Sequence, residues 1–122
     1  MPTLELTLPY PPTTNHYWRH VGNRVLISLS GRHYRSNVQK LLLLQRVQPI
    51  EGRLAVEVDV YPPDARRRDL DNIQKSLLDS LKHGGAYLDD SQIDDLHTRR
   101  CEKVLDGKVV VRIRELDIPE VR

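Results

Sequence analysis

One stretch of the chain, residues 66–90, combines closely spaced carboxylates with basic side chains. It reads RRRDLDNIQKSLLDSLKHGGAYLDD. Hard divalent cations such as Mg²⁺ bind carboxylate oxygens and keep several water ligands, and a nearby Lys or Arg suits the phosphate that completes the coordination. The residue types in this stretch therefore indicate a site for a metal ion and a phosphate.

The first two carboxylates are Asp69 and Asp71. Residues i and i+2 of an extended segment point to the same side, so an extended DLD would present both aspartates together, with Leu70 turned toward the core. A helix is expected to follow, with Asp71 or Asn72 as its N-cap. An apolar stripe at helical spacing supports this helix, and its members are Ile73, Leu77, Leu78 and Leu81.

Lys75 and the acidic pair Asp89-Asp90 complete the candidate site. Lys75 follows Asp71 by four residues, which is about one helical turn. The helix is expected to stop at the two glycines of residues 84–85. We expect the return segment to bring the second acidic pair back near the start of the helix, where carboxylates from two elements could hold one ion.

A plainer interpretation of the same residues has to be weighed. Aspartates are common at helix starts because they cap the helix and complement its dipole. Three consecutive arginines are usually a solvated loop. On this interpretation the chain would be a DNA-binding module without catalytic activity.

The order of these motifs resembles the RusA family, which consists of small Holliday-junction resolvases that are frequent in prophages. The most specific part is the run from Arg67 to Lys75, followed by Asp79, Leu81 and then residues 87–92. Residues 8–20 resemble the opening of the family, and residues 31–38 resemble its first helix. The resemblance covers nearly the whole chain in order.

The resemblance implies a metal-dependent endonuclease that resolves four-way DNA junctions, in recombination and repair, by paired phosphodiester cuts. It implies Asp69, Asp71, Lys75 and Asp90 as catalytic residues. The three aspartates would hold Mg²⁺, or alternatively Mn²⁺, and Asp89 is a further candidate ligand. The ion would polarise the phosphate and lower the pKa of an attacking water. Lys75 would stabilise charge on the phosphate or position the water.

The expected partners are junction DNA and a second copy of the chain. A four-way junction is two-fold symmetric and needs two matched cuts, which a C₂ homodimer would supply. The guanidinium group suits phosphate geometry, so the residues expected to contact the DNA backbone are Arg66, Arg67, Arg68 and Arg19. His16 and His20 are further residues that could contact phosphate. The aromatic residues of segment 13–20 could stack on bases or simply cover the edge of the core.

Length and composition bound these expectations. The chain has 122 residues, 39% hydrophobic, and is expected to form a single domain over residues 1–122. The formal net charge of +2 means that a DNA-binding surface must come from local clustering. One cysteine excludes an internal disulfide framework and favours a reducing cytoplasm. No apolar run reaches membrane-span length, and no signal peptide is visible.

Periodicity predicts five strands and two main helices. The strands are expected at residues 3–8, 25–28, 54–61, 93–104 and 108–116. The first helix is expected over 31–47, capped by Ser28 or Ser30. Its apolar run Leu41–Leu44 suggests either a deep core helix or a dimer contact. Asp106-Gly107 predicts a hairpin between the last two strands. The expected fold is α+β, or α/β if the central pairing is parallel, with a small mixed sheet and both helices on one face.

Two other functions remain open at this stage. The chain could be a less selective metal-dependent nuclease that cuts flaps or duplex DNA, or the non-enzymatic DNA-binding module described above. The position of Asp90 relative to Asp69 and Asp71 distinguishes the module from the enzyme.

Overall fold

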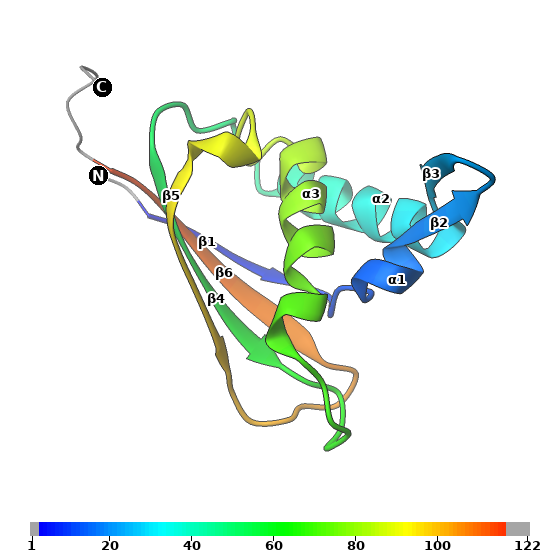
Figure 1. The fold of residues 1–122 in the computed structure, drawn as a ribbon. Helices are drawn as coiled ribbons and strands as arrows, with labels where there is room; N and C mark the ends of the chain where they lie inside the picture. Colours follow the sequence, from blue (N-terminus) through cyan, green and yellow to red (C-terminus); the bar gives the residue numbers. More distant parts are fainter. Residues whose placement is uncertain (1–2, 117–122) are drawn as a thin grey trace.

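The computed structural model describes residues 3–116, which form a mixed four-stranded sheet with helices on one face (Figure 1). The strands are β1 (Thr3–Leu8), β4 (Leu54–Tyr61), β5 (Ile93–Arg100) and β6 (Lys108–Glu115), in the order β1-β6-β4-β5. The two long helices are α2 (Leu29–Leu44) and α3 (Gln74–Gly84). The expected α+β class is confirmed.

Alternating apolar residues explain why the sheet is covered on one side. The side chains of Val109, Val111 and Ile113 in β6 are fully buried, while Arg112 and Arg114 between and after them point away from the core. On the opposite face, Asp59 pairs with Arg112 and Arg99, across β6 and β5. None of the helices in residues 3–116 covers this charged face, so the sheet and its helices form two layers (Figure 1).

The direction of β5 differs from the simplest prediction. β4 pairs antiparallel with β6 and parallel with β5. The hairpin predicted at Asp106-Gly107 is therefore wrong, because β4 lies between β5 and β6. Asp106 and Gly107 do adopt positive φ, at 66° and 69°. They lie in the connection from β5 to β6, which passes over the end of β4. The backbone N–H of Cys101 donates to Val60 O at 2.8 Å in this connection.

The helices end where local chemistry dictates. Ser28 caps α2, since its Oγ accepts a hydrogen bond from the Gly31 N–H at 2.9 Å. The chain leaves α3 at Gly85, which has φ of 92° and so adopts the left-handed conformation that glycine tolerates best. The end of α2 does not lie deep in the core, because Leu43 and Leu44 are 68% and 79% exposed.

The segment that was expected to be a loop, residues 13–20, contains regular structure. A short helix α1 (Thr14–Tyr17) leads directly into a hairpin of β2 (Trp18–Val21) and β3 (Arg24–Ile27). The hairpin projects beyond the start of α2, at the right of Figure 1. It is a separate two-stranded sheet that packs on the helical layer rather than extending the main sheet.

The core lies between the main sheet and the helices α2 and α3. Ile73, Leu77 and Leu81 of the predicted apolar stripe are at most 3% exposed. They face a cluster that includes Val38 and Leu42 of α2. Within residues 3–116, no helix is long and apolar enough to cross a membrane.

Candidate active site

The first acidic pair lies in the turn that precedes α3. Asp69 is extended, with φ of −93° and ψ of 136°, and a 3₁₀ turn, η1 (Leu70–Asn72), follows it at once. The prediction of an extended DLD is therefore correct only for its first residue. The prediction that Asp71 or Asn72 caps α3 is wrong, because Ile73 occupies the N-cap position and no side chain caps the helix.

The Asp69 and Asp71 side chains have no partner among residues 3–116. Both side chains are exposed, and neither forms a hydrogen bond or an ion pair with another residue of the described chain, 3–116. Lys75, in the first turn of α3, is likewise exposed and unpaired within this range. Capping does not account for the two carboxylates, whereas Mg²⁺ is commonly bound through one or two carboxylates while it keeps several water ligands.

The arginine run lies beside this turn and is organised by Asp64. Asp64 Oδ1 is 2.6 Å from Arg68 Nη1, and Asp64 Oδ2 is 3.3 Å from Arg66 Nε. The hydrogen bond from Arg68, helped by one from the Arg66 backbone, lowers the pKa of Asp64. Arg67 is exposed and has no carboxylate partner among the described residues. Arg67 is therefore the arginine of the run that is most available to a ligand.

The arginine run lines an open hollow of about 360 Å³. Two cations that sequence analysis missed also line it, namely Arg100 at the end of β5 and Lys103 in the following connection. The Arg100 guanidinium donates to the backbone carbonyl of Arg68. No local motif marks these two residues, because only the parallel pairing of β5 with β4 brings them to the arginine run. The full lining is Tyr10, Val60, Pro62, Asp64, Ala65, Arg66, Arg67, Arg68, Asp69, Leu70, Ile73, Arg100 and Lys103.

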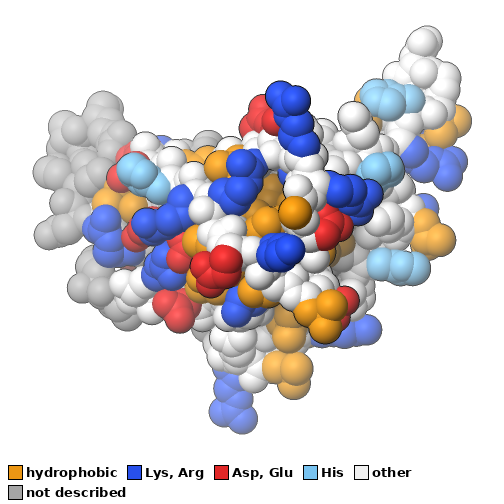
Figure 2. All heavy atoms as spheres, turned by 90° about the horizontal axis from the view of Figure 1, so that it is seen from below, with side chains coloured by type: hydrophobic (Ala, Val, Ile, Leu, Met, Phe, Trp, Pro, Cys, Tyr) orange, Lys and Arg blue, Asp and Glu red, His pale blue; other side chains and the backbone are white. Residues whose placement is uncertain are grey.

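The surface at this end of the molecule carries mixed charge. Figure 2, which views the molecule from below relative to Figure 1, shows Lys and Arg side chains gathered with Asp and Glu side chains among them. The modest net charge of +2 is thus compatible with a locally basic surface.

The two residues of the second acidic pair, Asp89 and Asp90, differ in their contacts. Asp89 caps the 3₁₀ turn η2 (Asp90–Gln92), accepting from the Ser91 N–H at 3.0 Å in a capping box with Gln92. Asp89 also pairs with Lys82 at 2.9 Å. Hydrogen bonds from Ser91 and Lys82 lower the pKa of Asp89. Asp90 is exposed and forms no ion pair in the part of the chain described, so Asp90 is the better candidate ligand. Burial and then the nearby Asp90 carboxylate raise the pKa of Tyr87, which places Asp90 beside the Tyr87 side chain.

Asp90 does not return to the start of α3 within one chain. The turn η2 lies at the C-terminal end of α3, where Asp89 meets Lys82, whereas η1 lies at the N-terminal end (Figure 1). The eleven residues of α3 span roughly 16 Å along the helix axis. The expected return is wrong because β5 runs parallel to β4, so that the start of β5 adjoins the start of β4.

This separation leaves the carboxylates in two groups. Among residues 3–116, no three His, Cys, Asp or Glu side chains gather closely enough to hold a metal ion. The structure places Asp69, Asp71 and Lys75 together at the start of α3, and Asp89 and Asp90 together at its other end.

The N-terminal elements are fastened to the carboxylate turn. Thr14 Oγ1 of α1 donates to Asn72 O at 3.0 Å. Ser76 Oγ of α3 donates to Pro12 O at 2.6 Å. These bonds hold α1 and the hairpin beside η1.

The three predicted phosphate contacts near the N-terminus, His16, Arg19 and His20, do not share one surface. His20 lines a second hollow, which Lys75 also lines. Arg19, the residue before His20 in β2, points to the other face of the hairpin. His16 lies in α1, where its Nδ1 is 2.8 Å from Thr13 Oγ1. The structure therefore brings only His20 close to a proposed catalytic residue.

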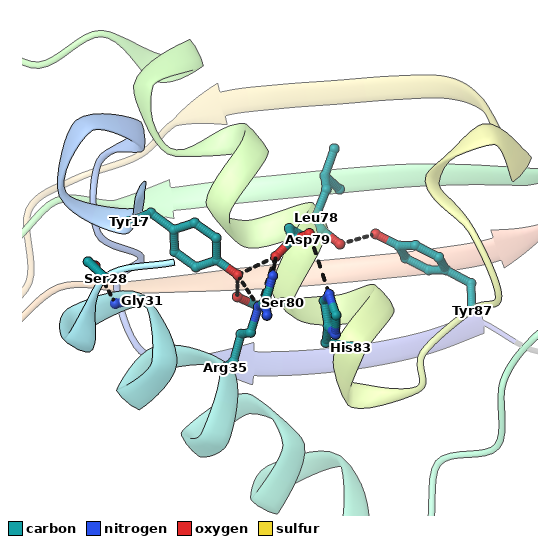
Figure 3. Close-up of polar contacts among 9 residues, drawn as sticks. All are labelled: Tyr17, Ser28, Gly31, Arg35, Leu78, Asp79, Ser80, His83 and Tyr87. Atoms are coloured by element: carbon teal, nitrogen blue, oxygen red, sulfur yellow. Dashed lines mark hydrogen bonds and ion pairs between the residues drawn. The ribbon is translucent and has the colours of Figure 1, made fainter. Parts of the chain in front are cut away.

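A polar network locks α1, α2 and α3 together (Figure 3). The Tyr17 hydroxyl donates to Asp79 Oδ2, and Arg35 Nη2 donates to the same oxygen at 2.7 Å. Ser80 Oγ lies 3.3 Å from the Tyr17 hydroxyl, and His83 Nε2 lies 3.8 Å from Asp79 Oδ1. Asp79, which follows Lys75 by four residues, thus acts as a structural anchor rather than as a member of the acidic site.

Comparisons with known proteins agree with the motifs. The sequence model of the family described as Endodeoxyribonuclease RusA matches residues 9–114. The chain is 44% identical to the crossover junction endodeoxyribonuclease rusA of Enterobacteria phage HK97, over 93% of this chain and 95% of that protein. It is 35% identical to the rusA protein of Enterobacteria phage 82 and 34% identical to the RusA protein of Escherichia coli strain K12. Both of these alignments cover 95% of this chain and 98% of the relative.

Proposed function

The chain belongs to the RusA family of endodeoxyribonucleases, and from this premise we infer that it resolves four-way DNA junctions. It is an enzyme that hydrolyses phosphodiester bonds of DNA, and the relatives named above are crossover junction endodeoxyribonucleases. Its role lies in recombination and repair, with junction DNA as the substrate. The whole chain acts as one domain, and the reaction takes place in the cytoplasm.

The observation that carries the assignment of the site is that the Asp69 and Asp71 side chains have no partner within residues 3–116. Two exposed carboxylates without a structural role, next to an arginine-lined hollow, suit a Mg²⁺ ion, which proteins commonly bind through one or two carboxylates and a substrate phosphate. Mn²⁺, which prefers the same oxygen ligands, would also fit. When bound, the ion supplies charge stabilisation at the phosphate and an activated water.

The remaining groups of this end of the molecule act on the DNA directly. Lys75 is unpaired within the described range and lies one helical turn from Asp71, so its ammonium group would stabilise charge on the scissile phosphate. Arg66, Arg67 and Arg68 would hold flanking phosphates, where Arg suits bidentate contact. Arg100 and Lys103 extend the same basic hollow. Arg19 and His16 remain proposed backbone contacts outside the hollow.

We propose that the enzyme is a homodimer. A two-fold symmetric junction requires two matched cuts, and one copy of the chain carries one Asp69–Asp71 turn. The exposed Leu43 and Leu44, which with Lys40 line a hollow on α2, offer apolar surface for an interface between copies.

Because Asp90 is separated from Asp71 within one chain, we propose that dimerisation also completes the metal site. Asp90 would supply a carboxylate to the site if it faced the Asp69–Asp71 turn of the other copy. In that arrangement each of two sites would be built from both copies, and a single copy would be incomplete. The same arrangement would explain why exposed carboxylates occur at both ends of α3.

A cleavage assay on a synthetic four-way junction tests the proposed function. We expect paired cuts with Mg²⁺ and none after chelation with EDTA. The same strands annealed as a flap and as plain duplex test the rival function of a less selective nuclease. Equal rates on all three substrates would replace junction resolution by general nuclease activity. Binding to the junction without cleavage by any divalent cation would leave only a DNA-binding module.

A further inference from the structure

A second hollow, of about 650 Å³, lies between the hairpin β2–β3 and the start of α3. It is lined by Thr14, Asn15, Trp18, His20, Val25 and Lys75. The hollow thus brings the hairpin next to the lysine assigned above to the scissile phosphate. Its volume lies within the range of about 300–1,000 Å³ that is usual for ligand sites in proteins.

The hairpin register explains how the lining is formed. His20 lies directly opposite Val25, and Trp18 lies two residues before His20 on the same side of β2. Trp18, His20 and Val25 therefore share one face of the hairpin, while Arg19 and Val21 lie on the other. Val25 is 56% exposed, so its side chain is accessible to a ligand in the hollow.

Trp18 is held in a fixed orientation by its neighbours. The Tyr17 ring meets it edge-on, with centroids 5.0 Å apart and an interplanar angle of 83°. Arg35 Cζ lies over the indole at 5.9 Å from its centroid. Arg35 does not line the hollow, so the indole presents a different side to it. Because Asp79 and the Tyr17 hydroxyl hold Arg35 in turn, the ring is preorganised.

The surroundings of the hollow point to a nucleotide as its occupant. The indole and Val25 offer a flat apolar surface, and Asn15 and Thr14 offer hydrogen-bonding groups of the kind that meet the edge of a base. Lys75 places a cation at the side where the phosphate of the same nucleotide would lie. The Thr14–Asn72 hydrogen bond fixes the hollow beside the carboxylate turn.

We propose that this hollow takes an unstacked nucleobase of the substrate DNA, stacked on Trp18, next to the phosphate that is cut. This proposal rests on the proposed function, and it adds a reason why branched DNA is preferred to duplex. A base at a branch point is released from its stack at lower cost than a base within a duplex, so the hollow favours substrates in which such a base is present.

The protein carries its own probe for this proposal, since Trp18 is its single tryptophan. Fluorescence of the full-length protein is measured during titration with a four-way junction, a duplex of the same length and a single-stranded oligonucleotide, in EDTA to prevent cleavage. We expect strong quenching by the junction and by the single strand, and little by saturating duplex. Emission that stays constant with all three DNAs would overturn the proposal.

Substitutions separate stacking from folding. Trp18→Ala should weaken junction binding by about 5- to 150-fold, the usual effect of removing one stacking aromatic residue. Trp18→Phe, which keeps an aromatic face, should recover most of the affinity. Trp18→Leu keeps apolar packing against Tyr17 and should behave like Ala. Val21→Ala, on the other face of the hairpin, is the matched control and should bind as the wild type does.

The outcomes distinguish this proposal from the function on which it rests. If the wild type binds and cuts junctions while Trp18→Ala and Trp18→Leu match it, the nucleobase site is wrong and the resolvase function stands. If quenching occurs but no cation supports cleavage, the nucleobase site stands and the resolvase function fails. Emission that changes with protein concentration alone would show that a second copy covers Trp18, which would also overturn the proposal.

Discussion

The hydroxyl of Tyr17 donates a hydrogen bond to the Asp79 carboxylate, which joins the helix before the hairpin to the helix that carries Lys75. The Tyr17 side chain is fully buried, and Arg35 binds both groups, at 2.7 Å from the hydroxyl and 2.7 Å from the carboxylate. This contact sets the position of the hairpin relative to the start of α3. Its loss should therefore affect both stability and the geometry of the site.

We expect Tyr17→Phe to lower the free energy of unfolding by about 1.5–3 kcal/mol, which is the usual range for a hydrogen bond to a charged group. The effect should depend on pH. Burial and the hydrogen bond to Asp79 raise the pKa of Tyr17 to about 12, against about 10 in the unfolded chain. A raised pKa stabilises the fold fully below the unfolded value, and this contribution is lost as the pH rises through the folded value.

Thermal unfolding of the wild type and of Tyr17→Phe between about pH 9 and pH 12 measures this contribution. The difference in Tm should be constant at the lower end and shrink toward the upper end. Buried Tyr34 and Tyr87 titrate in both proteins and cancel in the comparison. A difference that persists unchanged at the highest pH would mean that the hydroxyl contributes through packing alone.

Arg67 should contribute more to DNA binding than its neighbours. Arg66 and Arg68 are held by Asp64, whereas Arg67 has no carboxylate partner among residues 3–116. Arg67→Ala should weaken binding to every DNA sequence and reduce the slope of log affinity against log salt by roughly one unit. Arg99→Ala is the matched control, because Arg99 is committed to Asp59 and Glu57 on the charged face of the sheet. Equal salt slopes for Arg67→Ala and the wild type would place this arginine off the DNA.

Asp71→Asn should separate cutting from binding. Asp71 caps no helix and pairs with no residue of the described chain, so the amide should not disturb folding. Cleavage should fall by roughly 100-fold or more, as when one preorganised electrostatic group is removed from an active site. Binding in EDTA should persist or tighten, since one carboxylate no longer repels the phosphates. Gel shift and cleavage on the same junction measure both. Near wild-type cutting would remove Asp71 from the site.

The alternating patterns of the chain predicted the strands at residues 3–8 and 54–61 with the bounds that the structure has. The pairing of the strands could not be predicted from these local patterns. Asp106-Gly107 has the local conformation of a hairpin turn, yet the parallel pairing of β5 with β4 excludes a hairpin there. Strand direction depends on contacts between residues some forty positions apart, which local periodicity does not encode.

The same long-range pairing decides which site residues were predictable. Residue type and spacing identified Asp69, Asp71 and Lys75, because these lie on one continuous turn and helix. The positions of Arg100 and Asp90 follow from β5, whose end lies beside the arginine run and whose start lies at the far end of α3. Sequence alone therefore missed Arg100 and placed Asp90 too close to the start of α3.

The position of Asp90 leads to a prediction about mixed dimers. If each site combines the Asp69–Asp71 turn of one copy with Asp90 of the other, then Asp71→Asn and Asp90→Asn should each be inactive alone. A dimer with one chain of each variant would carry both substitutions in one site and neither in the other. It should therefore regain one working site.

A plasmid with an extruded cruciform measures this, since one working site yields an open circle and two yield a linear product. The two variants are co-expressed with different tags, and the mixed dimer is purified through both. We expect it to nick the cruciform without linearising it. The control is the mixed dimer of Asp69→Asn and Asp71→Asn, in which every shared site contains one substitution, so that no product should form.

The two mixtures distinguish a shared site from one built within a single chain. With sites built within one chain, the dimer of Asp71→Asn and Asp90→Asn would have both sites damaged and would be as inactive as the control. If the two variants pair at random, about half of the dimers contain one chain of each variant. Each of these mixed dimers has one working site out of two, so about one quarter of the wild-type number of sites should remain. Recovery in the first mixture and not in the second requires Asp90 to act across the interface. Inactivity of both mixtures would confine each site to one chain, with Asp71 and Asp90 acting in the same chain.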